Sequence, residues 1–248
     1  MRSAESCCHC SALTIPRGGG SANGARLPKV LSLDLDDTLW PVGPVIAAAE
    51  RAVLAWLRAH HPQAADGNDL ESMRSLRADV ARRFPGLQHD LTFVRRQALT
   101  EQFAAAGYAD AAAAEQALDV FLHERNRVDL YDDVLPALAR LKTRYRLFAV
   151  SNGNADLDRC GLGGWFEGHV TAASAGAAKP DARIFAELAA AARVGRDEIL
   201  HVGDDPLADV VGATQAGIAS VWLNRHARPW PAHFAPPART IASLRELV

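Results

Sequence analysis

A group of aspartates follows an apolar run near the start of the chain. Residues 30–34 read as a short buried strand, and Asp36 and Asp37 come directly after it. Ligands of an open α/β sheet bind just outside the carboxyl ends of its strands. A two-residue period sends Asp34 and Asp36 to the same side, where two carboxylates repel each other unless a cation or a shared proton intervenes. The pattern predicts either a site for a hard divalent metal or a pair of carboxyl groups with separate acid and base roles. An Asp-rich turn is the alternative.

Three further polar clusters come at the end of a predicted strand or before a predicted helix. In a parallel sheet the carboxyl ends of the strands meet at one edge, so we expect these clusters to lie beside the aspartates. Each cluster alone is more typical of a turn, a helix cap or a loop, and their occurrence together is what indicates a site. The clusters are Ser151-Asn152-Gly153, Lys179-Pro180 and Gly203-Asp204-Asp205.

The charges of these clusters predict a metal. Asp34, Asp36 and Asp204 would repel one another without a cation, and a set of oxygen ligands favours Mg²⁺. Asp209 is either the cap of the next helix or a residue that orients water on the metal. We expect Thr38 and Asp205, like Asp209, to support the metal ligands.

The same clusters predict phosphoryl transfer. Lys179 offers a positive charge to a phosphoryl group, and the Ser151 hydroxyl and the N–H groups around Asn152 can donate to phosphate oxygens. Asp34 is then the nucleophile that forms an aspartyl-phosphate. Asp36 protonates the leaving alcohol and later activates water.

The remaining sequence predicts two kinds of structure. Helical segments dominate residues 45–128, and strands alternate with helices from residue 133 onward, which is typical of a parallel, doubly wound, Rossmann-like α/β sheet. An all-helical block after a catalytic strand is expected to be a lid. We therefore predict an α/β core (28–44 and 129–248), a helical cap (45–128) and a disordered tail (1–27). The predicted helices are 45–60, 70–84, 92–106, 111–125, 133–143, 182–193 and 209–216, and the later strands are 147–150, 169–173, 199–202 and 219–223.

Composition excludes several classes of partner. The formal net charge of −2 provides no basic field for nucleic acid or for an anionic membrane surface. No apolar run approaches the roughly 20 residues of a membrane span, and the N-terminus lacks a signal-peptide pattern. Cys7, Cys8 and Cys10 lack the second ligand pair of a zinc site, so we predict reduced thiols in a cytoplasmic protein. The partner we expect is a small phosphorylated metabolite.

The motifs resemble those of the haloacid dehalogenase-like superfamily, from about Lys29 to the C-terminus. Asp34-Leu35-Asp36-Asp37-Thr38 is similar to its first motif, Ser151 to its second and Lys179 to its third, and Gly203-Asp204 through Asp209 to its fourth. The resemblance implies Asp34 as nucleophile, Asp36 as general acid and base, and Ser151 and Lys179 as phosphate binders. It also implies that Asp34, the backbone carbonyl of Asp36, and Asp204 hold Mg²⁺, and that residues 45–128 are the family's helical cap.

A narrower resemblance concerns the substrate. The chain is similar to bacterial phosphatases that act on FMN and on the ribityl-aminopyrimidine phosphate of riboflavin synthesis. Other enzymes with this core are phosphomutases and 2-haloacid dehalogenases, and the dehalogenase branch lacks an acid at the position of Asp36. A non-catalytic scaffold is a further alternative. The likeness rests on His61-Pro62, His89-Asp90, residues 125–129, residues 151–155 and residues 201–205, and the candidate substrate contacts are Trp40, Arg95, Arg96, Arg125 and Arg127.

Overall fold

A parallel sheet lies at the centre of the structure, a computed structural model that describes residues 27–108 and 111–248. Within those residues six strands pair in the order β3-β2-β1-β4-β5-β6, all parallel, which confirms the predicted α/β fold. The predicted disordered tail, with Cys7, Cys8 and Cys10, falls almost entirely outside the described residues. The strands are β1 (Val30–Leu33), β2 (Arg146–Ser151), β3 (Gly168–Thr171), β4 (Ile199–Gly203), β5 (Ala219–Leu223) and β6 (Thr240–Ile241).

The strand order reverses at β1. This strand pairs with β2 on one side and β4 on the other, so that Leu33 lies opposite Ala149 and Val202. The chain continues in register for one more residue, because the Asp34 N–H donates to the Val202 carbonyl over 2.9 Å. Asp34 therefore lies at the topological switch point, where open α/β sheets bind their ligands.

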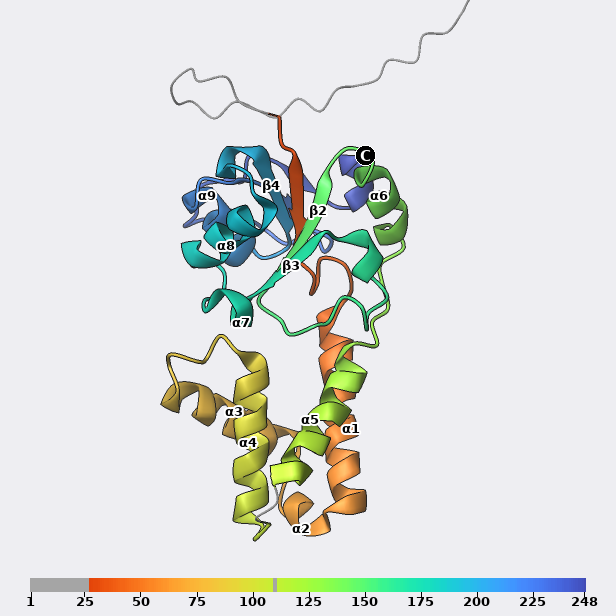
Figure 1. Ribbon diagram of the computed structural model, residues 1–248, viewed down its shortest axis with the longest axis vertical. Coiled ribbons are helices and arrows are strands. Elements are labelled where there is room, and N and C mark those ends of the chain that lie inside the picture. The colour runs from red at the N-terminus through yellow and green to blue at the C-terminus, as the bar shows by residue number, and fades with distance from the viewer. Residues whose placement is uncertain (1–26, 109–110) are drawn as a thin grey trace, which may run out of the picture.

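Helices cover both faces of the sheet. Alternate residues of β1 point to opposite faces, so Leu31 and Leu33 join one apolar cluster and Val30 joins another. Helix α6 (Val134–Leu141) and the 3-10 turn η4 (Leu244–Leu247) pack on the first face. Helices α8 (Ala182–Ala192) and α9 (Gly212–Gln215) pack on the second, and Figure 1 shows α8 and α9 on the opposite side of the strands from α6.

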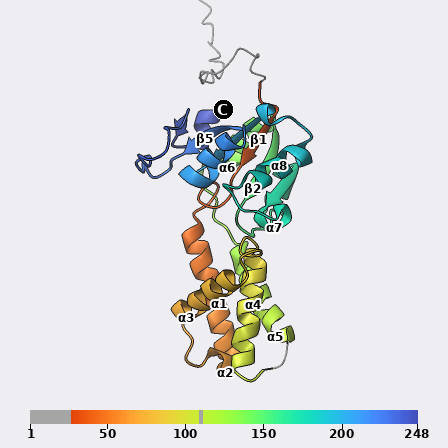
Figure 2. The same cartoon turned by 90° about the vertical axis from the view of Figure 1, so that its left-hand side faces the viewer.

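A separate group of helices, which we call the helical block (residues 42–125), lies beyond the carboxyl ends of the strands (Figures 1 and 2). It has its own apolar core, in which Val53 and Leu57 of α1 pack with Leu118 and Phe121 of α5. None of the helices in the described ranges is long and apolar enough to cross a membrane. The block consists of α1 (Val42–His60), α2 (Pro62–Ala65), α3 (Leu70–Arg83), α4 (Leu91–Ala105) and α5 (Ala111–Arg125).

Side-chain caps fix the starts of several elements and explain where the prediction fails. The first helix begins at Val42 and not at residue 45. Pro41 is its N-cap residue, and the Val42 N–H donates to the Asp37 carboxylate over 2.9 Å. The predicted strand 169–173 ends at Thr171, whose hydroxyl caps α7 (Ala172–Ala175). The predicted helix 209–216 begins earlier, as the π-helical turn η3 (Pro206–Val211), and Asp205 caps it. The interpretation of Asp209 as a helix cap is therefore wrong.

Candidate active site

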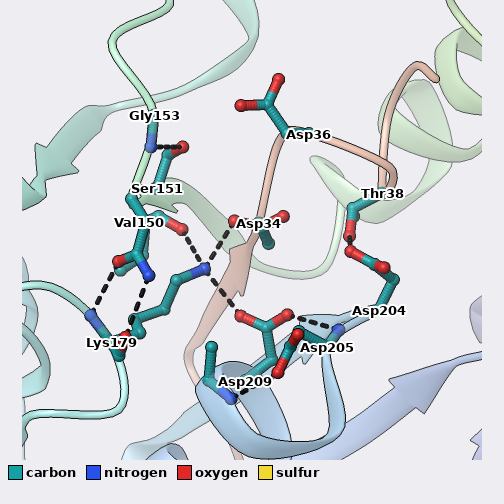
Figure 3. A network of polar contacts seen from close by, with 12 residues as sticks. Asp34, Asp36, Thr38, Val150, Ser151, Gly153, Lys179, Asp204, Asp205 and Asp209 are labelled. Atoms are coloured by element: carbon teal, nitrogen blue, oxygen red, sulfur yellow. Dashed lines mark hydrogen bonds and ion pairs between the residues drawn. The ribbon is translucent and has the colours of Figure 1, made fainter. Parts of the chain in front are cut away.

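Lys179 lies at the centre of the strand-end cluster (Figure 3). Its side chain is almost fully buried, and Nζ donates to Asp34 Oδ1 (2.5 Å), Asp209 Oδ1 (2.6 Å) and the Val150 carbonyl (2.9 Å). An ammonium has three N–H bonds, so every donor of this lysine has an acceptor. The two carboxylates raise the pKa of Lys179 against the effect of burial, so the cation is firmly held in its charged form.

Asn152 holds the backbone of Lys179 in place. Its side-chain amide donates to the Lys179 carbonyl (2.9 Å), and its side-chain oxygen accepts from the Lys179 N–H (2.7 Å). The side-chain amide of Asn152 is therefore occupied, and the phosphate contact expected from the N–H groups around Asn152 stays a prediction. In contrast, the buried Ser151 hydroxyl accepts from the Gly153 N–H (2.9 Å), which leaves its own hydrogen available to another acceptor.

A buried histidine supports the far side of the cluster. His201 Nε2 lies 3.2 Å from Asp209 Oδ1, and His201 Nδ1 lies 2.8 Å from the Ser32 hydroxyl. Burial lowers the pKa of His201 although Asp209 opposes the shift. Because a carboxylate only accepts, the geometry suits a neutral imidazole that donates from Nε2 to Asp209 and accepts from the Ser32 hydroxyl. The backbone N–H of Asp205 also donates to Asp209 (2.9 Å). Sequence reasoning missed Ser32 and gave His201 no role beyond the narrower resemblance. The available signal was a polar residue in each of two adjacent buried strands.

Three carboxylates meet beside Lys179. Asp34, Asp204 and Asp209 each provide an oxygen, and these oxygens lie within 4.8 Å of one another. Burial raises the pKa of Asp34 well above its usual value, and burial followed by the charge of Asp209 raises the pKa of Asp204 to about 6. Burial and mutual repulsion disfavour the charged forms of these closely spaced oxygen donors, and a divalent cation such as Mg²⁺ would stabilise them. Asp209, which we expected to support the ligands, thus lies among the possible ligands themselves.

Two further groups hold Asp204. The Thr38 hydroxyl lies 3.4 Å from Asp204 Oδ1, in the supporting position that the sequence predicts. Arg228, from the loop after β5, donates to Asp204 Oδ2 over 2.9 Å and to its carbonyl over 3.0 Å. Sequence reasoning missed Arg228, because no local pattern marks it.

The carboxylate of Asp36 lies outside this cluster. Figure 3 shows it pointing away from Lys179, and it accepts from Trp40 Nε1 (2.9 Å) and from Arg125 Nη2 (2.7 and 2.8 Å). Burial raises the pKa of Asp36, although Arg125 and Trp40 oppose the shift. The prediction that Asp34 and Asp36 point the same way is wrong, because the two-residue period ends with β1 at Leu33.

The candidate substrate contacts have three different surroundings. Trp40 and Arg125 are buried and bind Asp36, whereas Arg96 and Arg127 pair with Glu115 and Glu124 on the surface of the helical block. The guanidinium of Arg95 instead stacks on the Phe121 ring, 3.3 Å from its centroid. Trp40 and Arg125 are thus the two candidates placed at a proposed catalytic carboxylate.

Comparison with known proteins assigns the family. A profile of haloacid dehalogenase-like hydrolases matches residues 28–217, which is more than half of the chain. The chain belongs to the haloacid dehalogenase-like hydrolase family. It is therefore a hydrolase, and the resemblance carried by the four motifs is confirmed.

Three relatives illustrate the range of this hydrolase family. The 5-amino-6-(5-phospho-D-ribitylamino)uracil phosphatase YigB of Escherichia coli is 34% identical over 196 residues, which cover 78% of this chain and 82% of the relative. The phosphoserine phosphatase of Thermus thermophilus is 31% identical over 246 residues, covering 88% and 97%. A solved structure from Pseudomonas syringae, named as a 2-haloacid dehalogenase, shares 34% identity and a TM-score of 0.84, covering 89% and 96%. Because these names include both activities, the site residues must distinguish them.

Proposed function

We propose that the chain is a cytoplasmic, Mg²⁺-dependent phosphomonoester hydrolase that acts on a small phosphorylated metabolite through an aspartyl-phosphate. The observation that carries this proposal is the pair Asp34 and Asp36. Asp34 is fixed at the switch point beside the Lys179 cation, and the carboxyl group of Asp36 lies apart from it with a raised pKa. Two carboxyl groups in such different surroundings suit different roles, one as nucleophile and one as acid.

The proposed reaction has two steps. A carboxylate oxygen of Asp34 forms a bond to phosphorus while the bond from phosphorus to the alcohol oxygen breaks, and Asp36 gives its proton to that oxygen. Water then attacks phosphorus, Asp36 takes a proton from the water, and the bond to Asp34 breaks to release phosphate. Lys179 balances negative charge at Asp34, and the Ser151 hydroxyl donates to a phosphoryl oxygen.

The carboxylate cluster is the proposed metal site. Asp34, Asp204 and Asp209 fit a hard cation by donor type and spacing, and the backbone carbonyl of Asp36 is the ligand that the family resemblance adds. When bound there, Mg²⁺ would neutralise charge on the phosphoryl oxygens. We propose that the helical block, which the sequence predicts as residues 45–128, is a cap that covers this site.

Asp36 favours a phosphatase over a 2-haloacid dehalogenase. An alkoxide leaving group needs a proton, whereas a halide leaves without one, so an acid beside the nucleophile is useful to the first reaction alone. The dehalogenase name of the Pseudomonas structure makes that activity the second candidate. The name of the E. coli relative makes 5-amino-6-(5-phospho-D-ribitylamino)uracil the first substrate to examine, and the resemblance carried by the sequence adds FMN.

The test is release of inorganic phosphate from a panel of phosphomonoesters, with Mg²⁺ and with EDTA. The panel includes FMN, ribityl and sugar phosphates, nucleotides, phosphoserine and phosphoglycolate, and halide release from 2-haloacids is measured in parallel. We expect metal-dependent phosphate release in proportion to the substrate consumed, which would also exclude a phosphomutase. Halide release without phosphate release would overturn the proposal.

A further inference from the structure

Arg125 connects the helical block to the catalytic aspartates. It is the last residue of α5, and among the described residues of the block it alone binds one of the two proposed catalytic carboxylates. The other contacts from this region reach neighbouring loops, such as Thr92 to Asn154 and Asn126 to the Asp156 N–H. A movement of the helical block would therefore displace Arg125 and change its contact with Asp36.

The hydrogen bonding of Arg125 is incomplete. Its side chain is 1% exposed, and Nη2 donates to both oxygens of Asp36. Nε and Nη1 are buried and have no hydrogen-bond partner. An arginine that only links two elements typically donates from several of its guanidinium nitrogens, because buried donors without a partner are destabilising. This side chain is instead held against one carboxylate by a single nitrogen, which indicates a role at the site.

Gly153 shows that this contact borders Ser151, whose hydroxyl we propose to bind phosphate. A Cβ atom at Gly153 would lie 2.5 Å from Asp36 Oδ2, 3.0 Å from Arg125 Nη2 and 3.2 Å from the Ser151 hydroxyl. The missing side chain leaves room where the acid, the guanidinium and the phosphate-binding hydroxyl converge. Arg125 thus lies on the side of the site that faces the helical block, where the leaving group of a phosphomonoester would extend.

We propose that Arg125 is a positioning residue, which holds Asp36 beside the leaving-group oxygen as the phosphoester bond breaks. This proposal rests on the proposed function. In the first step the phosphorus–oxygen bond breaks, its electron pair stays on the alcohol oxygen, and that oxygen receives the proton of Asp36. Arg125 does not exchange a proton. It restricts the orientation of the carboxyl group that does.

The proposal predicts a dependence on the leaving group. An alkoxide is a strong base and needs the proton of Asp36, whereas p-nitrophenolate is a weak base and leaves without it. Loss of the positioning contact should therefore slow hydrolysis of alkyl phosphates and leave p-nitrophenyl phosphate nearly unaffected. A loss of folding or of phosphate binding would slow both.

The experiment compares Arg125→Met with Arg127→Met. Arg127 is the matched control, since it lies two residues further along, is exposed and pairs with Glu124. We expect Arg125→Met to lower kcat/KM by about 100-fold for the alkyl ester that the wild type hydrolyses best, and less than about threefold for p-nitrophenyl phosphate. Arg127→Met should change neither, and Arg125→Lys should restore part of the alkyl ester activity because it keeps a cation near Asp36.

A double-mutant cycle tests whether Arg125 acts through Asp36. If Arg125 acts through Asp36, the variant carrying both Asp36→Asn and Arg125→Met should be no slower on the alkyl ester than Asp36→Asn alone. A further loss in the double variant, or equal losses on both esters in Arg125→Met, would overturn the positioning role. Thermal unfolding and binding of inorganic phosphate identify a variant that is misfolded, in which case Arg125→Lys and Arg125→Gln decide the question. If the wild type hydrolyses neither ester with Mg²⁺, the proposed function itself fails.

Discussion

Two buried ion clusters in this protein have opposite arrangements of charge. In the core, Lys179 lies between the carboxylates of Asp34 and Asp209. In the helical block, the buried carboxylate of Glu50 lies between the guanidinium groups of Arg74 and Arg77. Each cluster therefore holds one charge between two of the other sign.

The two clusters differ in the electrostatic charge that they leave uncompensated. Both oxygens of Glu50 have arginine partners, and the Arg74 side chain is 54% exposed, so water solvates the excess positive charge. In the core, Asp204 adds a carboxylate that pairs with Arg228, so the excess negative charge remains on the two buried carboxylates that share Lys179. The Glu50 cluster, whose charges are paired or solvated, links α1 to α3. The Lys179 cluster is buried and has excess charge of one sign, which is typical of a binding site for a cation or a reacting group.

The largest expected effect is on activity, from Asp34→Asn. The amide keeps the shape of the carboxylate but is not a nucleophile, so phosphatase activity should fall by about 10⁴-fold or more. Phosphate release from the best substrate of the panel, with Mg²⁺ present, measures the loss. Asp37→Asn is the matched control, because Asp37 lies outside the carboxylate cluster and its left-handed φ of 58° is one that Asn tolerates. Full activity in Asp34→Asn would contradict the assignment of the nucleophile.

The next effect is on stability, from Lys179→Met in the metal-free protein. Without the lysine, the buried carboxylates of Asp34 and Asp209 lose their shared cation, and we expect a loss of about 3–5 kcal/mol in the free energy of unfolding. Urea denaturation of the variant measures this loss, and Mg²⁺ should stabilise the variant more than the wild type. Lys142→Met, at an exposed lysine of the core, serves as the control. A loss of stability of similar size in Lys179→Met and Lys142→Met would contradict the special role of the buried cluster.

A smaller effect is expected from Glu50→Gln in the helical block. Arg74 remains solvated and Arg77 keeps a neutral acceptor, so the free energy of unfolding should fall by about 1–2 kcal/mol. Phosphatase activity should stay within about twofold of the wild type, since this cluster is proposed to be structural. Glu115→Gln, which removes an exposed pair with Arg96, should have almost no effect. Loss of activity in Glu50→Gln without loss of stability would show that the Glu50 cluster of the helical block is also functional.

The smallest expected effect is on the pH dependence of stability, at the buried carboxylate of Asp133. Asp133 is buried in the core, where burial would raise its pKa, but bonds from Arg225, the Ser243 hydroxyl and the Leu244 N–H lower the pKa below its usual value of 3.8. A depressed pKa stabilises the fold above 3.8, and that stabilisation is lost as the pH falls through the lower, folded value. Stability measured by urea between pH 5 and pH 3 should therefore decline less in Asp133→Asn than in the wild type. Parallel declines would contradict this.

The sequence by itself determined the elements and most of the chemistry at their ends. Helix α5 (Ala111–Arg125) and strand β5 (Ala219–Leu223) have the bounds that the pattern predicts, because apolar period and helix propensity act over a few residues. The strand-end position of Asp34 and the convergence of Lys179 and Asp204 beside it follow from parallel strands. Two-residue β6 and four-residue α2 were missed, since elements this short carry no periodic signal.

The tertiary structure alone decided which side chains meet and what they face. Asp36 turns away from the carboxylate cluster and Asp209 enters it, although the period of β1 and the likeness of Asp209 to a helix cap indicated otherwise. Arg125 reaches Asp36 across 89 residues of sequence, and His201 reaches Ser32 across 169. Such contacts depend on how whole elements pack, and no interaction within a few residues of the chain encodes them. The physical reason is that local propensities set the elements, whereas the pairing of buried charges is set by long-range packing in a low-dielectric interior.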